Sequence, residues 1–235
     1  MTTPGSDLLQ RAFFILAIAL IGIAHVGVKR ASLACGDGPG VAAALARRFD
    51  LMAAAWVLVV IVAAVKGVLR EWDWRPPLFP ILAAFMAAYG VFIARSTFGD
   101  RLPLAYLVLF QSFRLPLELV MHRAYTEGVM PVQMSYSGRN FDIITGVTAL
   151  VLGVAMLMWT VPKSIVWVWN VMGLALLVNI VGVAILSLPL VQFFGPDRVN
   201  TFVTYPPYVL LPSIMVLAAW AGHLVIFRAL VIQSR

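Results

Sequence analysis

Four polar side chains occupy an otherwise apolar stretch, FQSFRLPLELVMHRAYTEG, at residues 110–128. They are Gln111, Arg114, Glu118 and His122. Because an α-helix turns by about 100° per residue, this spacing predicts that all four lie within an arc of about 80° on one helix face. Carboxylate and imidazole groups exchange protons, and a guanidinium pairs with anions. The stretch therefore predicts a binding or proton-handling site, with Glu118 and His122 as the candidate catalytic bases.

The same residues also allow a purely structural interpretation. Arg114 and Glu118 are four residues apart and can neutralise one another as an ion pair. Pro116 has no N–H, so it leaves the Ser112 carbonyl free and predicts a kink between Arg114 and Glu118. An ionisable group in mid-membrane costs at least about 2.5–3.5 kcal/mol and commonly marks a function. We favour a site and keep the ion pair as the alternative.

A second group of polar residues follows in the loop PVQMSYSGRNFDI, residues 131–143. Asp142 or Asn140 is a natural N-cap for the next helix. Arg139 beside that helix N-terminus predicts an anion site at the entrance to the site formed by the four polar residues of 110–128. The complete predicted ligand-binding set is Gln111, Arg114, Glu118, His122, Tyr136, Arg139, Asn140 and Asp142.

Composition indicates that these residues belong to a membrane protein. Hydrophobic residues make up 62% of the chain, charged residues 11%, and the mean hydropathy is +0.96. A soluble domain has about 25% charged residues. The net charge of +7 does not indicate a nucleic-acid partner, because the cations gather at the ends of apolar segments. The expected surroundings are a lipid bilayer.

The apolar segments predict an all-α integral membrane protein, a single bundle of seven transmembrane helices without internal domain boundaries over residues 1–235. Each segment is long enough, at about 20 residues, to cross about 30 Å of hydrocarbon. Lys29 and Arg30 separate the first apolar run from Cys35, so we expect that run to be a retained helix rather than a cleaved signal. The predicted helices lie near residues 10–28, 50–69, 78–95, 103–123, 142–161, 164–190 and 208–231.

An odd number of crossings places the two termini on opposite faces of the membrane. Nine Lys and Arg residues fall on the face opposite the N-terminus and seven on the N-terminal face. The first connection contributes Lys29, Arg30, Arg47 and Arg48 to the larger group. Because cytoplasmic loops are richer in Lys and Arg, we predict an outside N-terminus and a cytoplasmic C-terminus.

Three histidines raise the possibility of a metal or haem site. His122 is predicted near one face of the membrane, whereas His25 and His223 are nearer the other, so depth separates them by more than about 10 Å. His25 and His223 remain weak candidates for metal or axial haem ligands if their helices are neighbours. The alternative is that both are hydrogen-bonded within the bundle. No other cofactor is indicated, and the last segment has no lysine for a retinal Schiff base.

The pattern FR-x-x-x-E-x-x-x-H, followed by a loop ending in GRNFDI, resembles a group of uncharacterised bacterial multi-pass membrane proteins. The similarity covers the fourth and fifth segments and extends to TYPPYVLLP. It implies a bacterial source, and hence the inner membrane, together with a family-specific site. It implies no particular activity.

Three functions stay open from the sequence. The leading hypothesis is binding or transport of a small anionic or amphiphilic molecule, with Arg114 pairing with its negative charge. The second is an intramembrane enzyme acting on a lipid-like substrate, with Glu118 or His122 as general base. The third is a non-catalytic subunit or assembly factor, whose polar face would contact a protein partner or a second copy of the chain.

Overall fold

The computed structural model describes residues 5–71, 78–95 and 101–232, and within these ranges it contains helices and no strands. The α-helices are α1 Asp7–Ala34, α2 Pro39–Val65, α3 Leu78–Arg95, α4 Leu104–Phe110, α5 Arg114–Thr126, α6 Asp142–Met158, α7 Lys163–Leu186 and α8 Leu217–Ile232. Single 3-10 turns form η1 Val68–Arg70, η3 Gln111–Phe113, η4 Val132–Met134, η5 Pro196–Arg198 and η6 Phe202–Thr204. A π-helix, η7 Leu211–Val216, leads directly into α8.

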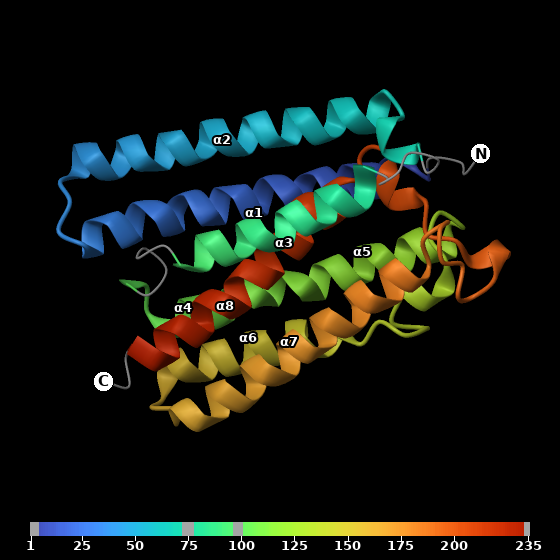
Figure 1. Cartoon of the computed structure of the whole chain (residues 1–235). Helices are drawn as coiled ribbons and strands as arrows, with labels where there is room; N and C mark the ends of the chain where they lie inside the picture. Colours follow the sequence, from blue (N-terminus) through green and yellow to red (C-terminus); the bar gives the residue numbers. More distant parts are fainter. Residues whose placement is uncertain (1–4, 72–77, 96–100, 233–235) are drawn as a thin grey trace.

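These elements form long rods that alternate in direction, with α4, η3 and α5 making one rod and η7 and α8 another (Figure 1). Apolar helices therefore occur at all of the predicted positions. Within the described ranges, five helical segments are long and apolar enough to cross a membrane: Asp7–Ala34, Pro39–Val65, Leu104–Thr126, Lys163–Leu186 and Leu211–Ile232. Ile81–Phe92 and Asp142–Met158 are shorter apolar helices. The chain is thus an all-helical protein of the membrane type, with five clear candidate spans.

The first two helices are longer than their apolar runs predict. α1 continues to Ala34, and α2 begins at Pro39, 11 residues before the expected start at residue 50. The segment GVAAALARR consists largely of good helix formers, and proline is favoured in the first helical turn. At 1.5 Å per residue, α1 is about 42 Å long, more than the hydrocarbon thickness of about 30 Å. The extra turns of α1 and α2 contain the basic residues near their connection, Lys29, Arg30, Arg47 and Arg48.

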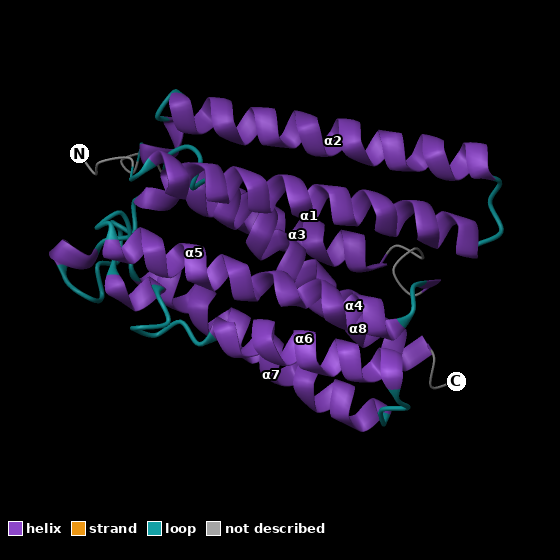
Figure 2. Cartoon of the chain, turned by 180° about the vertical axis from the view of Figure 1, so that it is seen from behind, coloured by secondary structure: helices purple, strands orange, loops and turns teal. Residues whose placement is uncertain are grey.

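The helices are arranged around a central rod formed by α4, η3 and α5. α6 packs along this rod, α7 contacts α6 and α8, and α3 lies on α8. α1 covers α5 and η7, and α2 lies outside α1, which leaves α2 as the outermost helix (Figures 1 and 2). α1 begins and α8 ends at opposite ends of the bundle (Figure 1). This arrangement buries the middle of the polar stretch at residues 110–128.

Candidate functional site

Small residues bring the backbones of α6 and α8 close to the central rod. A Cβ atom added to Gly146 would lie 2.3 Å from the backbone nitrogen of Leu115. A Cβ atom on Gly222 would lie 2.3 Å from Nε2 of Gln111. Glycine at both positions therefore permits helix contacts that any larger side chain would block, as is common between membrane helices. Arg114 lies between these two contacts and is 1% exposed.

The guanidinium of Arg114 is surrounded by protein groups from three helices. Its Nε donates to Oδ2 of Asp142 at 2.9 Å, and its NH2 group also donates to this oxygen. NH1 lies 2.8 Å from Nε2 of His223 and 3.4 Å from the Gly173 carbonyl oxygen. A buried charge needs this degree of pairing, because unpaired it would be strongly destabilising. Arg114 thus joins α5 to α6, α7 and α8.

The contact with Arg114 determines the protonation of His223. A guanidinium has only donors, so Nε2 of His223 must accept and carry no proton. The proton is then on Nδ1, which donates to Oδ1 of Asn170 at 2.7 Å. Asn170 Nδ2 donates to the His223 backbone carbonyl at 3.1 Å. His223 is therefore a neutral, doubly hydrogen-bonded histidine inside the bundle.

Glu118 belongs to the same cluster but does not contact Arg114. Its Oε2 accepts a hydrogen bond from Asn140 Nδ2 at 2.7 Å, and the same Nδ2 group donates to the Met134 carbonyl at 3.0 Å. Oδ1 of Asn140 accepts from the backbone N–H of Asp142 at 3.1 Å. Glu118 is 2% exposed and Asn140 is fully buried. Asn140 therefore links the Glu118 carboxyl group to the first residue of α6.

Three local predictions need correction. The buried ion pair of Arg114 is with Asp142 and not with Glu118. α6 begins at Asp142 after Phe141, so neither Asp142 nor Asn140 occupies the cap position, although the Asn140 side chain does accept the Asp142 N–H. The α-helix is interrupted at Gln111–Phe113 and not between Arg114 and Glu118. Pro116 disturbs the turn before it, because its ring conflicts with the carbonyl four residues earlier.

His122, the last residue of the predicted polar face, is separated from the buried cluster. Its Nδ1 lies 3.0 Å from Oγ of Ser135 and 3.3 Å from Oγ of Ser137. The ring stacks on Tyr136 with centroids 4.3 Å apart and an interplanar angle of 18°. His122 is half-buried and holds the loop after α5 in place. Gln111, at the other end, is fully buried and donates to the Ala219 carbonyl at 3.1 Å.

Arg139 lies at the surface, away from the buried carboxylates. Its guanidinium is over the ring of Phe194, 5.4 Å from the centroid, and its carbonyl accepts from Asn179 Nδ2 at 2.8 Å. Asn179 is exposed, whereas Asn170 is buried beside His223. The start of α6 is occupied by Asn140 and Asp142. The structure does not bring Arg139 to an anion site there.

The two remaining histidine candidates lie in different surroundings. His25 Nδ1 is 2.8 Å from Oδ2 of Asp50, and these side chains are 37% and 43% exposed. His223 is fully buried with Arg114 and Asn170 as partners. Within the described part of the chain, no group of three His, Cys, Asp or Glu side chains is placed to hold a metal ion. The structure therefore adds nothing to the prediction of a metal or haem site at these histidines.

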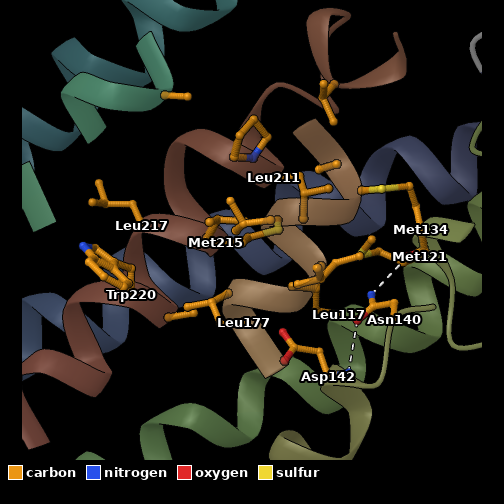
Figure 3. A pocket seen from close by; sticks show the side chains of 18 of the residues that line it. Leu117, Met121, Met134, Asn140, Asp142, Leu177, Leu211, Met215, Leu217 and Trp220 are labelled. Carbon is orange, nitrogen blue, oxygen red and sulfur yellow. Dashed lines mark hydrogen bonds between the residues drawn. The ribbon is translucent and has the colours of Figure 1, made fainter. Parts of the chain in front are cut away.

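A cavity of about 370 Å³ adjoins the buried cluster (Figure 3). Its walls come from α3, η3, α5, the first residue of α6, α7, η7, the start of α8 and the connections at residues 127–141 and 187–210. Most of the lining is apolar, including Leu117, Met121, Leu177, Met215 and Trp220. Figure 3 shows Asn140 and Asp142 on one side of this space and Trp220 on the far side. The cavity thus combines a long apolar wall with a short polar end.

The polar side chains in the lining are Arg114, Glu118, Asn140, Asp142 and Asn200. Oδ1 of Asp142 and Oδ1 of Asn200 are buried and receive no hydrogen bond from the described residues. These side chains are 5% and 1% exposed, respectively. Buried polar atoms are nearly always hydrogen-bonded. Two unsatisfied oxygens on residues that line a cavity are therefore candidates for contact with a ligand.

The cavity reaches the outer surface of the bundle between α3 and α7. Ala83 and Ala87 on α3, and Val178 and Ile185 on α7, are exposed and also line the cavity. All four side chains are apolar, and both helices present further apolar residues outward. An opening with this lining presents an apolar surface, as membrane-spanning helices do toward lipid.

A family model described as a domain of unknown function, DUF8737, matches residues 77–231. This segment is more than half of the chain. The chain belongs to the DUF8737 family. The matched segment begins just before α3, so it includes every element of the cavity, whereas α1 and α2 precede it. No curated protein and no solved structure matches the chain.

Two residues of the cluster in this DUF8737 chain were absent from the predicted ligand-binding set. His223 was a weak candidate for a metal or haem ligand, with hydrogen bonding within the bundle as the alternative, and the structure shows it hydrogen-bonded to Arg114 and Asn170. Asn200 lies in the connection before η6, and nothing in its neighbourhood, GPDRVNTF, sets it apart from an ordinary polar loop. Its connection folds back onto the end of α7, where the Asn200 backbone N–H donates to the Ser187 carbonyl at 2.7 Å, and this makes Asn200 part of the cavity lining.

Proposed function

We propose that this protein binds an amphiphilic molecule inside the membrane, in the cavity between α3, α5, α7 and η7. The observation that carries the proposal is the division of the lining into a long apolar wall and a buried polar end. A volume of about 370 Å³ falls within the usual range for small-molecule pockets, which is about 300–1,000 Å³. The side opening allows such a molecule to enter directly from the bilayer.

The apolar wall suits a flexible hydrocarbon chain. Met86, Met121, Met134 and Met215 all line the cavity. Methionine is unbranched and polarizable, so it adapts to irregular apolar surfaces. The wall ends at Glu118 and Asp142, where a head group would meet polar partners. This geometry supports an amphiphile over a small, fully polar solute.

Binding is better supported than passage across the membrane. The described residues that line the cavity come from one half of the bundle, between the start of α8 and the connections at residues 127–141 and 187–210. α4 and the connections at the opposite end contribute none of them. Transport therefore stays a prediction. So does the bacterial inner membrane as the location, with the N-terminus outside and the C-terminus in the cytoplasm.

The enzymatic alternative has weaker geometric support. Glu118 lines the cavity, but His122 is on the other side of Asn140 with Ser135 and Tyr136 as neighbours. A general base at Glu118 would have to act without His122. Arg114, the predicted stabiliser of a developing anion, already donates to Asp142 and His223.

Native mass spectrometry after gentle extraction tests the proposal. The wild type is compared with Ala184→Phe, which adds a ring to the cavity wall, and with Ala175→Phe, which adds the same ring to an exposed position on α7 outside the cavity. We expect an amphiphile to be retained by the wild type and by Ala175→Phe, and to be lost from Ala184→Phe. Equal retention by all three proteins, or a mixture matching the bulk lipids, would refute a specific site in this cavity.

A further inference from the structure

We infer that the cavity selects an amphiphile whose head group donates hydrogen bonds, an alcohol or an amine, and disfavours an anionic head group. The inference rests on the proposed function and names the class of its ligand. It departs from the prediction that Arg114 attracts a negative charge. It is argued from the donors and acceptors that the cavity presents.

Two acceptors in the cavity lining are available. Oδ1 of Asp142 and Oδ1 of Asn200 receive no hydrogen bond from the described residues. A carboxylate has no donor, and the carbonyl oxygen of asparagine only accepts. Leaving such an oxygen buried and unpaired is costly, whereas a hydroxyl or ammonium group would satisfy it. Both atoms therefore match a ligand that donates.

The donors at the polar end are already in use. Nε, NH1 and NH2 of Arg114 donate to Asp142, His223 and the Gly173 carbonyl. The Nδ2 group of Asn140 donates to Glu118 and to the Met134 carbonyl. An anionic head group would have to displace one of these protein partners before it could form a hydrogen bond here.

Charge leads to the same conclusion. Among the described residues that line the cavity, Arg114 is the single cation, and Asp142 already neutralises it. Arg139 lies over Phe194 at the surface and is not among them. Glu118 adds a further carboxyl group. A carboxylate or phosphate ligand would therefore enter next to two acidic side chains with no unpaired positive charge, whereas an amine could donate hydrogen bonds to them.

Trp220 provides a reporter at the apolar end of the cavity (Figure 3). The purified protein in detergent is titrated with three probes of equal chain length, ω-bromoundecanol, ω-bromoundecylamine and ω-bromoundecanoic acid. Bromine quenches tryptophan on contact, so a probe with its head at Asp142 would quench Trp220. The Trp220→Phe variant measures the quenching of the other tryptophans. Subtracting this signal from that of the wild type leaves the quenching of Trp220.

The expected result is saturable, Trp220-dependent quenching by the alcohol and the amine at concentrations at least about tenfold lower than for the acid. Comparison of the first two probes distinguishes a neutral head group from a cationic one. Equal quenching by all three probes, or tightest binding of the acid, overturns the inference while leaving an amphiphile site in place. Absence of Trp220-dependent quenching by every probe overturns both the inference and the proposed function.

Asn200 supplies a second test that leaves the Arg114 cluster intact. Asn200→Leu removes the unpaired oxygen, and we expect it to weaken alcohol binding by about fivefold, the usual effect of one lost hydrogen bond. Asn200→Asp keeps an acceptor and should retain binding of the alcohol. Asn179→Leu changes an exposed asparagine outside the cavity and controls for the substitution itself. Unchanged alcohol binding in Asn200→Leu would contradict the assigned role of this oxygen.

Discussion

Arg114 on α5 and Asp142 on α6 form an ion pair across 28 residues of sequence, with both side chains buried inside an apolar bundle. The pair fixes the start of α6 against the middle of the α4–α5 rod. It also places Oδ1 of Asp142 at the end of the cavity, because Oδ2 takes both hydrogen bonds from Arg114. The Arg114–Asp142 ion pair therefore orients Oδ1 of Asp142, the atom that we propose contacts the ligand.

Breaking this pair from one side should destabilise the protein strongly. Arg114→Met leaves a buried carboxylate without its cation, and the expected loss is about 3–5 kcal/mol of unfolding free energy. The double variant Arg114→Met/Asp142→Leu buries no unpaired charge, so it should be more stable than the single variant. Denaturation in mixed detergent micelles measures both. A double variant no more stable than Arg114→Met would show that the pair itself is not the source of the loss.

The close contact at Gly146 should tolerate no side chain. Gly146→Ala places a methyl group against the Leu115 backbone nitrogen, and backbone cannot move aside as a flexible side chain can. We expect a loss of about 1–3 kcal/mol, typical of overpacking. Gly182→Ala on α7 is the control, since its added Cβ would meet nothing within 4 Å. It should be neutral or stabilising by up to about 1 kcal/mol, in line with helix propensity. Equal effects at both positions would contradict the tight α5–α6 contact.

The N-terminal segment should loosen in acid through Glu127, which follows α5. The Ser6 backbone N–H donates to Oε2 of Glu127 at 2.7 Å, and Nε of Arg123 donates to Oε1 at 2.5 Å. Above all the Ser6 backbone contact, and then Arg123, lower the pKa of Glu127 from 4.5 to about 2. A carboxyl group with a lowered folded-state pKa stabilises the fold above its unfolded pKa of 4.5, and this contribution is lost as the pH falls to about 2.

Hydrogen exchange at the Ser6 amide measures this effect, with rates corrected for intrinsic exchange. Protection should decrease between pH 4.5 and about pH 2 in the wild type. Glu127→Gln should show lower protection at neutral pH and little change across the same range. A wild-type profile that is flat over this interval would argue against the Glu127 contact as the anchor of the N-terminal segment.

Glu118 and His122 should differ in their effects on ligand binding, although the sequence places them on one helix face. His122→Gln alters a residue outside the cavity lining, so probe binding should change by no more than about twofold, the range typical of peripheral substitutions. Glu118→Gln replaces an acceptor at the polar end and should weaken binding of the amine probe more than that of the alcohol. The quenching titration with Trp220 compares the two. Strong loss of binding in His122→Gln would favour a joint Glu118–His122 site instead.

The positions of the helices follow from the sequence, because runs of apolar residues have no alternative to helix in a membrane. The predicted range 78–95 coincides with α3, and the start of α6 is at the predicted residue 142. The end of α1 and the start of α2 were placed too close to the hydrocarbon region, because hydropathy measures that region and not the helix. The charged turns around Lys29 and Arg47 stay helical in water.

The polar face of residues 111–122 also follows from the sequence, since helical periodicity alone determines which residues share a face. Gln111, Arg114 and Glu118 are indeed all buried. Helical periodicity does not predict which group each of these side chains hydrogen-bonds. The spacing of four residues suggested Glu118 as the partner of Arg114, but Asp142 and His223 are closer in space at separations of 28 and 109 residues.

The sequence by itself thus determined a helical protein of the membrane type and one helix with a buried polar face, because hydropathy and periodicity act over short distances along the chain. Only the tertiary structure decided that Arg114 is neutralised by Asp142, that His122 lies apart, and that Asn200 reaches the cavity. The physical reason is packing between helices. Gly146, Gly173 and Gly222 set how closely the helices approach, and that approach determines which polar atoms are paired and which face the ligand.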